Sequence, residues 1–200
     1  MVKVKTSQKI LSCAIRMFAQ HGYGGTIMDE LAEQCGVNKA SIYYHHKDKA
    51  TLYESALIAL FTPIADAVIE AVKSESTPVG KLERHIKEFA IANAEHPDFA
   101  AILMREMASG GANMPVRARE QMQRILFLLR EILQKGESQN IFKSSDPLII
   151  HFMIVGTINL FVASIPLRNS LPEKGQLNNR DIESAYEQVT ETILSSLIIK

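Results

Sequence analysis

Residues 26–46 read TIMDELAEQCGVNKASIYYHH, and two short helical patterns lie in this stretch on either side of a glycine. Thr26 is expected to be the N-cap of the first helix, with Asp29 three residues on completing a capping box. Asn38 has the side chain of a good N-cap for the second helix. Only about three residues, including Gly36, separate the two helices, which is the spacing of a helix-turn-helix. The stretch therefore predicts two short helices that meet at a tight turn.

The rest of the chain shows the periodicity of amphipathic helices, and no convincing run of alternating strand residues interrupts it. We therefore predict an all-α fold. Apart from the two short helices, the expected helices cover residues 7–20, 47–73, 81–95, 97–109, 115–135, 146–165 and 180–199. Segments rich in Gly, Pro, Asn or Ser separate the later helices.

The length of 200 residues allows one ordinary domain or two small ones with an apolar core. Hydrophobic residues make up 46% and charged residues 22%, which is a globular composition. The net charge is zero, but residues 1–50 carry seven Lys and Arg against four Asp and Glu, and a basic end suits a polyanion. We expect an N-terminal helix-turn-helix domain over residues 1–46 and a larger helical domain over 47–200. The helix that begins near residue 47 would link the two.

The N-terminus, MVKVKTSQK, lacks the apolar core and cleavage site of a signal peptide, and the two cysteines form no CxxC pair. Cys13 and Cys35 lie on apolar helix faces with little positive charge nearby, which keeps a thiol protonated and inert. A cytoplasmic location is expected.

Residues 148–167 form a stretch of 20 residues without a charged side chain, which is long enough to span a bilayer. His151 and Asn159 dilute its hydrophobicity, and neither Trp nor Tyr stands at its ends. A helix that is apolar all round is otherwise buried between helices or in an oligomer interface. We favour that interpretation, with no membrane contact, and keep a membrane-associated helical protein as an alternative.

A helical metal-binding protein is the second alternative, because His45 and His46 are adjacent. Adjacent helical residues point in different directions, whereas a chelating pair on a helix needs a spacing of four. His46 is therefore expected to lie at the edge of the core. No nucleophile can be placed beside an orienting base, so we expect no enzyme, no catalytic site, no metal and no cofactor.

The second short helix carries side chains that suit DNA. Lys39 could donate to guanine, Ser41 could bond a base in either direction, and Ala40 is small enough to contact a thymine methyl group. Tyr43 and Tyr44 offer flat apolar faces with a hydroxyl donor. Such a helix would lie in the major groove of a DNA duplex.

The stretch from Thr26 to Leu52, TIMDELAEQCGVNKASIYYHHKDKATL, resembles the DNA-binding head of the TetR family of bacterial transcriptional regulators. The resemblance covers residues 10–57. The positions in register with the family's pattern are Thr26, Leu31, Gly36, Val37, Ala40, Ile42, Tyr43, His45, Lys49 and Leu52. His46 departs from that pattern, which usually has an apolar residue at this position.

The resemblance implies a homodimeric, all-α repressor that binds a palindromic operator in double-stranded DNA and is released by a small-molecule effector. The last two long helices, within 148–167 and 180–199, would form the dimer interface. By position, the phosphate contacts would be Thr26, Tyr44, His45 and Lys49. The residues facing bases would be Lys39, Ala40, Ser41 and Tyr43.

The resemblance also implies an effector pocket in the larger domain. Walls rich in Met and aromatic residues suit a largely apolar effector, and a few polar side chains could orient it. The candidate lining residues are Phe99, Leu103, Met104, Met107, Met122, Phe127, His151, Phe152 and Asn159. Every apolar member of this set could instead belong to the core, because stripes at helical spacing are core by default.

Overall fold

The computed structural model describes residues 6–170 and 181–199. Lys3 and Lys5 of the basic excess lie outside these residues, as does Arg180, where the last helix was expected to begin. Within the described residues the secondary structure is helical, and the only strand-like pairing is an isolated bridge between Phe142 and Ile198. The all-α prediction is confirmed.

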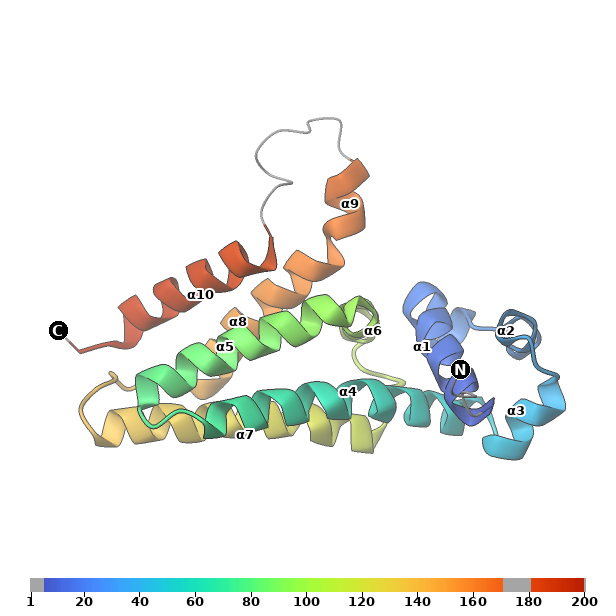
Figure 1. Ribbon diagram of the computed structural model, residues 1–200, viewed down its shortest axis with the longest axis horizontal. Coiled ribbons are helices and arrows are strands. Elements are labelled where there is room, and N and C mark those ends of the chain that lie inside the picture. The colour runs from blue at the N-terminus through green and yellow to red at the C-terminus, as the bar shows by residue number, and fades with distance from the viewer. Residues whose placement is uncertain (1–5, 171–180, 200) are drawn as a thin grey trace.

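Three helices form a unit at one end of the elongated molecule (Figure 1): α1 (Thr6–Gly25), α2 (Met28–Cys35) and α3 (Lys39–His45). Buried apolar side chains fill the space between these three helices. The backbone of α1 leaves helical conformation at Gly22, where φ is 70°. Gly36 ends α2 with a φ of 60°, a conformation that glycine adopts without a steric cost. The predicted tight turn between two short helices is therefore confirmed.

The helix α4 (Lys49–Lys73) connects this unit to the rest of the chain. Its first turns pack against α1, and the remainder packs against α5 (Pro78–Glu95) and α7 (Val116–Ser138). Asp48 caps α4 by accepting a hydrogen bond from the backbone N–H of Thr51 at 2.7 Å. One apolar helix thus contributes to the core of both parts.

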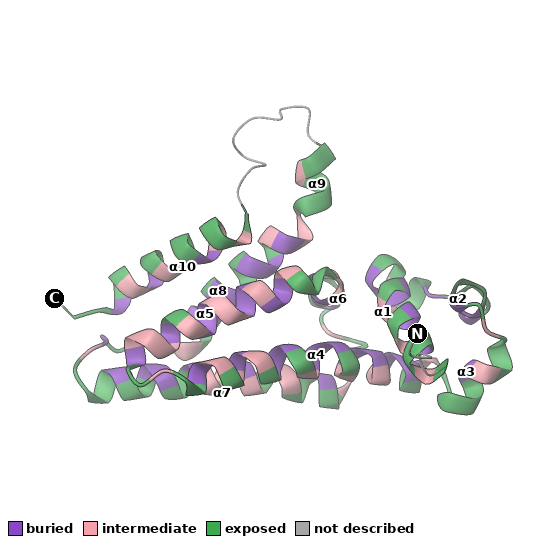
Figure 2. Cartoon of the chain, viewed as in Figure 1, coloured by how far each residue is buried: buried purple, intermediate pink, exposed green. Residues whose placement is uncertain are grey.

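The remaining helices complete the larger part: α6 (Pro97–Ala108), α8 (Pro147–Ala163), α9 (Ile165–Ser170) and α10 (Ile182–Leu197). The helix α6 touches both α1 and α8, while α10 lies against α5 and α8. Figure 2 shows buried residues along α4 and α5 and exposed ones along the outer side of α10. The helix α6 is therefore placed to connect the N-terminal unit with the C-terminal helices.

Several helix boundaries differ from those predicted, and α1 runs to Gly25, past the break at Gly22, rather than ending at residue 20. The helix α5 begins at Pro78 rather than at residue 81, because Thr77 accepts a hydrogen bond from Gly80 N and proline is favourable in a first turn. The helix α7 continues past residue 135 to Ser138. The helix α9 occupies part of a segment expected to be a break, and there the backbone N–H of Arg168 donates to Ser164 O at 2.9 Å.

Candidate functional site

The helix α3 is anchored by one buried side chain and presents its other side chains outward. Ile42 is fully buried among the N-terminal helices, whereas Tyr44 is 86% exposed. Asn38 is the N-cap of α3, as predicted, and its Oδ1 accepts a hydrogen bond from Ser41 N at 2.7 Å. The backbone N–H of Val37 donates to Ala32 O at 3.0 Å, which fixes the turn that precedes α3. A firmly held helix with an open outer face is what insertion into a groove requires.

The open face of α3 contains most of the residues predicted to meet DNA. Ser41 is half-buried, and the exposed residues are Lys39, Ala40, Tyr43, Tyr44 and His45. The rings of Tyr44 and His45 meet edge to face, with their centroids 5.1 Å apart. The structure therefore brings these six predicted residues together on one short helix.

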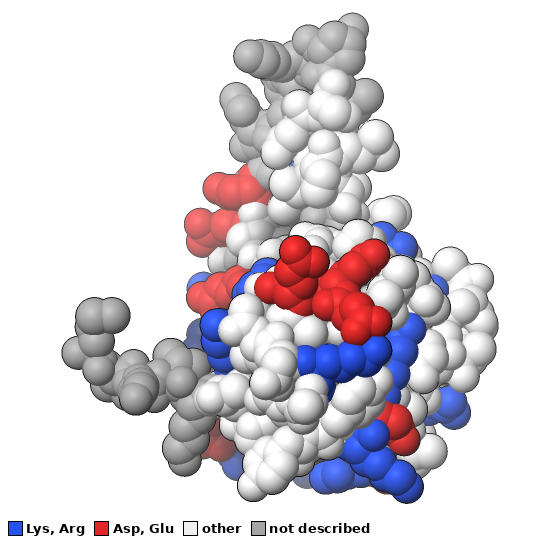
Figure 3. All heavy atoms as spheres, turned by 90° about the vertical axis from the view of Figure 1, so that its right-hand side faces the viewer, with Lys and Arg blue, Asp and Glu red and all other residues white. Residues whose placement is uncertain are grey.

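Lys39 is not free in this structure. Its Nζ forms an ion pair with Asp29 on α2, at 2.8 Å from Oδ1. This hydrogen-bonded partner raises the pKa of the Lys39 ammonium. Figure 3 views this end of the molecule and shows an acidic patch next to basic side chains. The Asp29 carboxylate thus holds the Lys39 ammonium against α2.

Lys49 lies apart from α3, where the N-terminus of α4 meets the end of α1. Its Nζ donates to Gly24 O at 3.4 Å and lies 4.8 Å from the centre of the Tyr23 ring. Partial burial lowers the pKa of Lys49. The first backbone N–H groups of a helix attract anions, although the Asp48 carboxylate already occupies part of this end. Lys49 is thus a positive charge held at the edge of the N-terminal unit.

The predicted capping role of Thr26 is wrong. The N-cap position of α2 is Ile27, which makes no side-chain cap bond, and the Thr26 hydroxyl donates to Gly22 O at 2.8 Å instead. Thr26 is 1% exposed, so its hydroxyl closes the break in α1 and does not face a surface where a phosphate could lie. The break at Gly22 frees the carbonyl that this hydroxyl binds.

The two cysteines are buried on apolar helix faces, as predicted, and His46, expected at the edge of the core and bonded to a carbonyl, is buried. Burial lowers the pKa of His46, and its Nε2 has no hydrogen-bond partner. Burial and the neighbouring Cys13 raise the pKa of the Cys35 thiol to about 12, which disfavours the reactive thiolate. Across residues 6–170 and 181–199, no group of three or more His, Cys, Asp and Glu could hold a metal ion.

Two side chains of α6 tie the N-terminal unit to the larger part. Arg105 donates from Nε to Ala19 O at 2.9 Å and from Nη2 to Gln20 O at 2.6 Å, just before the break in α1. Its neighbour Glu106 is buried and accepts a hydrogen bond from the Tyr53 hydroxyl of α4 at 2.7 Å. The helix α6 is therefore bonded directly to both α1 and α4.

Three of the candidate pocket residues line one hollow next to Glu106. This hollow, of about 340 Å³, lies between α6, the turn at Gly110 and Gly111, and the start of α7. The candidates on its wall are Leu103, Met107 and Met122. Glu106 also lines it, so the hollow borders the carboxylate that joins α6 to α4.

The other six candidate pocket residues lie elsewhere. Phe99 packs against Phe61, with ring centroids 4.7 Å apart, and is part of the core. Phe127 and Phe152 are exposed on α7 and α8, and Met104 is half-buried on α6. His151 and Asn159 are buried on α8. The structure does not gather the predicted set around one cavity.

Sequence reasoning missed two buried polar residues of α5, His85 and Asn93. Asn93 Nδ2 donates to Asn159 Oδ1, so α5 and α8 share a polar contact inside an apolar interface. Burial, with a smaller contribution from nearby His151, lowers the pKa of His85 to about 3. The sequence signal that could have identified His85 and Asn93 is that each is a polar residue on the otherwise apolar face of a predicted helix.

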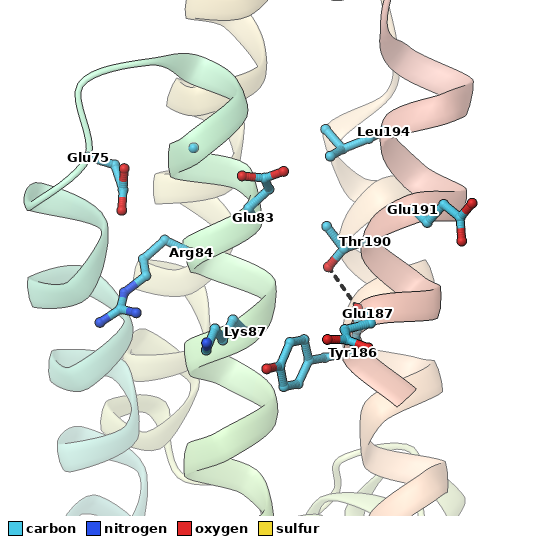
Figure 4. A pocket seen from close by; sticks show the side chains of 10 residues that line it. Glu75, Glu83, Arg84, Lys87, Tyr186, Glu187, Thr190, Glu191 and Leu194 are labelled. Carbon is cyan, nitrogen blue, oxygen red and sulfur yellow. Dashed lines mark hydrogen bonds between the residues drawn. The ribbon is translucent and has the colours of Figure 1, made fainter. Parts of the chain in front are cut away.

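A second hollow lies between α5 and α10 (Figure 4). Its volume is about 420 Å³, and Figure 4 shows carboxylates from both helices around it, including Glu83 and Glu191. Lys87 supplies positive charge from α5, and its Nζ lies 5.6 Å from the centre of the Tyr186 ring. This hollow is charged, unlike the apolar pocket predicted from the sequence.

The outer face of α8 is the most apolar exposed surface among the described helices. Its exposed members are Leu148, Ile149, Phe152, Met153 and Leu160. The helix α8 has 17 residues, and the 148–167 stretch continues after Ser164 into the separate helix α9. Among the described helices, α4 alone meets the length and hydropathy of a membrane span, and 44% of its apolar window is buried inside the protein. The core role of α4 accounts for its composition.

Two family models match the chain. The model of bacterial regulatory proteins of the tetR family matches residues 10–56, and that of the tetracyclin repressor-like C-terminal domain matches residues 78–193. The Staphylococcus aureus biofilm operon icaADBC HTH-type negative transcriptional regulator IcaR is 30% identical over 81 residues, which are 40% of this chain and 44% of that protein. The chain thus spans less than half the length of this curated relative.

Solved structures share the fold over nearly the whole chain. The transcriptional regulator FadR from Bacillus subtilis, in complex with stearoyl-CoA, has a TM-score of 0.70 and 22% identity and covers 94% of this chain and 97% of its own. The ketosteroid transcriptional regulator KstR2 of Mycobacterium tuberculosis has a TM-score of 0.75 and 18% identity, with coverages of 99% and 97%. With α1–α3 matching one family model and the larger part matching the other, the chain belongs to the tetR family of bacterial regulatory proteins.

Proposed function

We propose that this TetR-family regulator is a cytoplasmic repressor that binds a palindromic operator as a homodimer and leaves it when a small-molecule effector binds. The DNA-binding head would comprise residues 1–46 and the effector-binding and dimerisation domain residues 47–200. The observation that carries the proposal is α3, a helix seated by buried Ile42 with its polar and aromatic side chains exposed. No catalytic role is proposed, since the family consists of DNA-binding regulators.

The contacts with DNA follow from the placement of side chains on and near α3. Lys39, Ala40, Ser41 and Tyr43 would face base edges in the major groove. Tyr44, His45 and Lys49 would contact phosphates on either side of the groove. Thr26 is left out of this set because its hydroxyl is buried and bonded to Gly22 O.

The dimer interface would combine the outer faces of α8 and α10. An exposed apolar face of this length on a helix marks a surface that another protein covers. The helix α10 adds a polar outer face with small side chains, including Ser184 and Ser195, which allow close packing of backbones. Sedimentation at micromolar concentration is expected to give a dimer, and a monomer would contradict this assignment. Phe152→Glu should convert the dimer to monomers, because it would place two charges in an apolar contact.

The effector would act through α6. FadR was solved with stearoyl-CoA, which carries a long apolar acyl chain, and KstR2 is a ketosteroid regulator, so an effector with a large apolar part fits this proposal. The helix α6 contacts α8 on one side, and Arg105 and Glu106 bond it to α1 and α4 on the other. A displacement of α6 would therefore change the position of the head and the separation of the two recognition helices. A ligand shifts that equilibrium only through unequal affinity for the two arrangements.

Selection of bound fragments from random DNA tests the proposal. The purified chain is expected to enrich a palindrome whose half-sites lie about 34 Å, one turn of DNA, apart. Enrichment of no sequence above that of a protein-free control would overturn the function. As a matched control, Lys135→Ala removes an exposed positive charge at the far end of α7 and should leave the enriched sequence and its affinity unchanged.

A further inference from the structure

Four buried polar side chains lie in the contact between α5 and α8. His85 and Asn93 come from α5, and His151 and Asn159 come from α8, with exposures from 0% to 8%. On each helix the two polar residues are separated by eight positions, so they lie on the same face. The direct bond between Asn93 and Asn159 marks one level, and His85 and His151, each eight positions earlier on its helix and near enough for His151 to affect the pKa of His85, mark the other. An asparagine pair and a histidine pair thus mark two ends of one interface.

Most of the hydrogen-bonding capacity of these side chains is unused. Asn93 Nδ2 donates to Asn159 Oδ1, but Asn93 Oδ1 and Asn159 Nδ2 have no partner. At the other level, both ring nitrogens of His85 and Nδ1 of His151 also lack a partner, and all these atoms are shielded from solvent. Buried polar atoms are nearly always hydrogen-bonded in native proteins, so a group of them that no atom of the chain satisfies is suited to partners from outside the chain.

The site carries no charge of its own at neutral pH. Burial lowers the pKa of His85 to about 3 and also lowers that of His151, so both rings are neutral. A neutral imidazole and an amide each offer one kind of donor and one kind of acceptor. An ionised ligand buried here would meet no opposite charge among the four polar side chains, and burying an unpaired charge is costly. The occupant suited to these groups is uncharged.

The shape of the occupant follows from the helices. Eight residues along a helix correspond to about 12 Å, which separates the two polar levels. Between them, one helical turn from each polar residue, stand the buried apolar side chains Phe89 and Val155. A molecule that reached both levels would need an apolar middle and a hydrogen-bonding group at each end.

We propose that α5 and α8 part to admit an uncharged, elongated, mainly apolar molecule whose two ends hydrogen-bond to the asparagine pair and the histidine pair. This rests on the proposed function, since the molecule would be its effector. Separation of α5 and α8 would shift the N-terminal unit, because α8 packs against α6 and α6 is hydrogen-bonded to α1. The ligand's terminal oxygens would give the unpartnered atoms of both levels the hydrogen bonds they lack.

Three linear probes of equal carbon number test the inference on the purified full-length chain. They are 1,8-octanediol, octan-1-ol and the dianion of octanedioic acid, and binding is measured by titration calorimetry and by the shift in Tm. The diol is expected to bind and to raise Tm. Octan-1-ol is expected to bind about tenfold more weakly, because it lacks hydrogen bonds at one end. The dianion is expected not to bind. Equal affinities for the diol and octan-1-ol, binding of the dianion, or no binding of the diol would each overturn the proposal.

Paired variants separate a ligand contact from a structural one. The double variant Asn93→Leu with Asn159→Leu replaces both bonded partners by apolar groups of similar size, so its Tm without probe should be unchanged or higher. Its affinity for the diol should fall to that for octan-1-ol. The control Thr62→Val removes a buried hydroxyl without a partner on α4, outside the four polar residues of the site, and should keep the diol affinity of the original chain. Undiminished diol binding by the double variant would refute the site.

The outcomes also separate this inference from the proposed function. Enrichment of a palindrome together with failure of the diol test would leave the repressor function standing and overturn only the ligand site. Specific diol binding without any enriched DNA would support the site and overturn the function.

Discussion

Tyr53→Phe is expected to destabilise the protein through a single lost hydrogen bond. The Tyr53 hydroxyl donates to Glu106 Oε1 at 2.7 Å, and both side chains are buried. The other oxygen of Glu106 accepts only a longer bond, 3.3 Å, from the backbone N–H of Asn113. Burial and the neighbouring Glu106 also raise the pKa of the Tyr53 hydroxyl, so it remains a donor throughout the physiological range. Removing it leaves a buried carboxylate with one weak partner.

The size of the effect follows from that geometry. A hydrogen bond to a charged group contributes about 1.5–3 kcal/mol when the alternative is a buried, unpaired oxygen. For a chain of this length each kcal/mol lowers Tm by about 2–4 °C, so the expected loss is roughly 3–12 °C. Glu106→Gln keeps the shape of the side chain but removes its charge, and should weaken the same bond. The two substitutions should therefore not be additive.

Urea unfolding of the two single variants and the double variant measures the coupling, at one protein concentration because subunit association affects stability. We expect a coupling free energy of about 1–3 kcal/mol between positions 53 and 106. A value below about 0.5 kcal/mol would refute the reasoning, since it would mean that the carboxylate finds equal hydrogen bonding elsewhere. Tyr186→Phe is the matched control. Its hydroxyl bonds at 3.1 Å to the exposed Glu183, so its loss should change stability by less than about 0.5 kcal/mol.

Lys49→Ala should weaken binding to all DNA sequences and reduce the salt slope by about one, whereas Lys39→Ala should relax sequence preference, as anisotropy titrations on matched and mismatched operators would show. Equal loss of specificity from both would contradict these roles. Gly136→Ala should cost about 1–3 kcal/mol in urea unfolding, because its Cβ would overlap the buried ring of Phe142; an unchanged midpoint would argue against that packing. His85 is neutral in the folded protein down to about pH 3 but protonates near pH 6.5 when unfolded, so stability should be lost as pH falls below about 6.5. His85→Leu should reduce that slope by up to about 1.4 kcal/mol per pH unit, and an identical slope would show that other groups cause it.

The N-terminal unit could be predicted closely because local chemistry determines it. Gly36 and Asn38 specify the turn and the cap of α3 within a few residues, and the structure has both where they were predicted. Thr26 was mispredicted because two nearby groups compete for its hydroxyl. The α2 backbone is the partner suggested by the sequence, but the break of α1 at Gly22 brings a carbonyl closer. Which partner is used depends on how α1 and α2 pack.

The pocket residues could not be predicted because their positions depend on how each helix is rotated in the assembled fold. Phe99 and Phe127 both lie in amphipathic patterns, yet the first is buried and the second is exposed. The sequence alone does not show which apolar stripe faces the core, a cavity or another subunit. His151 and Asn159 were identified as polar groups on an apolar helix, but their counterparts on α5 became visible only when the two helices were seen in contact.

The unpartnered atoms between α5 and α8 also bear on how an effector could release DNA. Each buried donor or acceptor without a partner costs about 1–3 kcal/mol, and a ligand that supplies the missing bonds recovers part of that cost only in the arrangement it fits. A differential affinity of about 5.5 kcal/mol moves a two-state equilibrium from 1:99 to 99:1. Hydrogen bonds at both levels could supply much of that difference, whereas bonds at one level could not. A ligand with one polar end should therefore bind without releasing operator, while a ligand with two should do both, and operator release measured with the diol and with octan-1-ol decides between these outcomes.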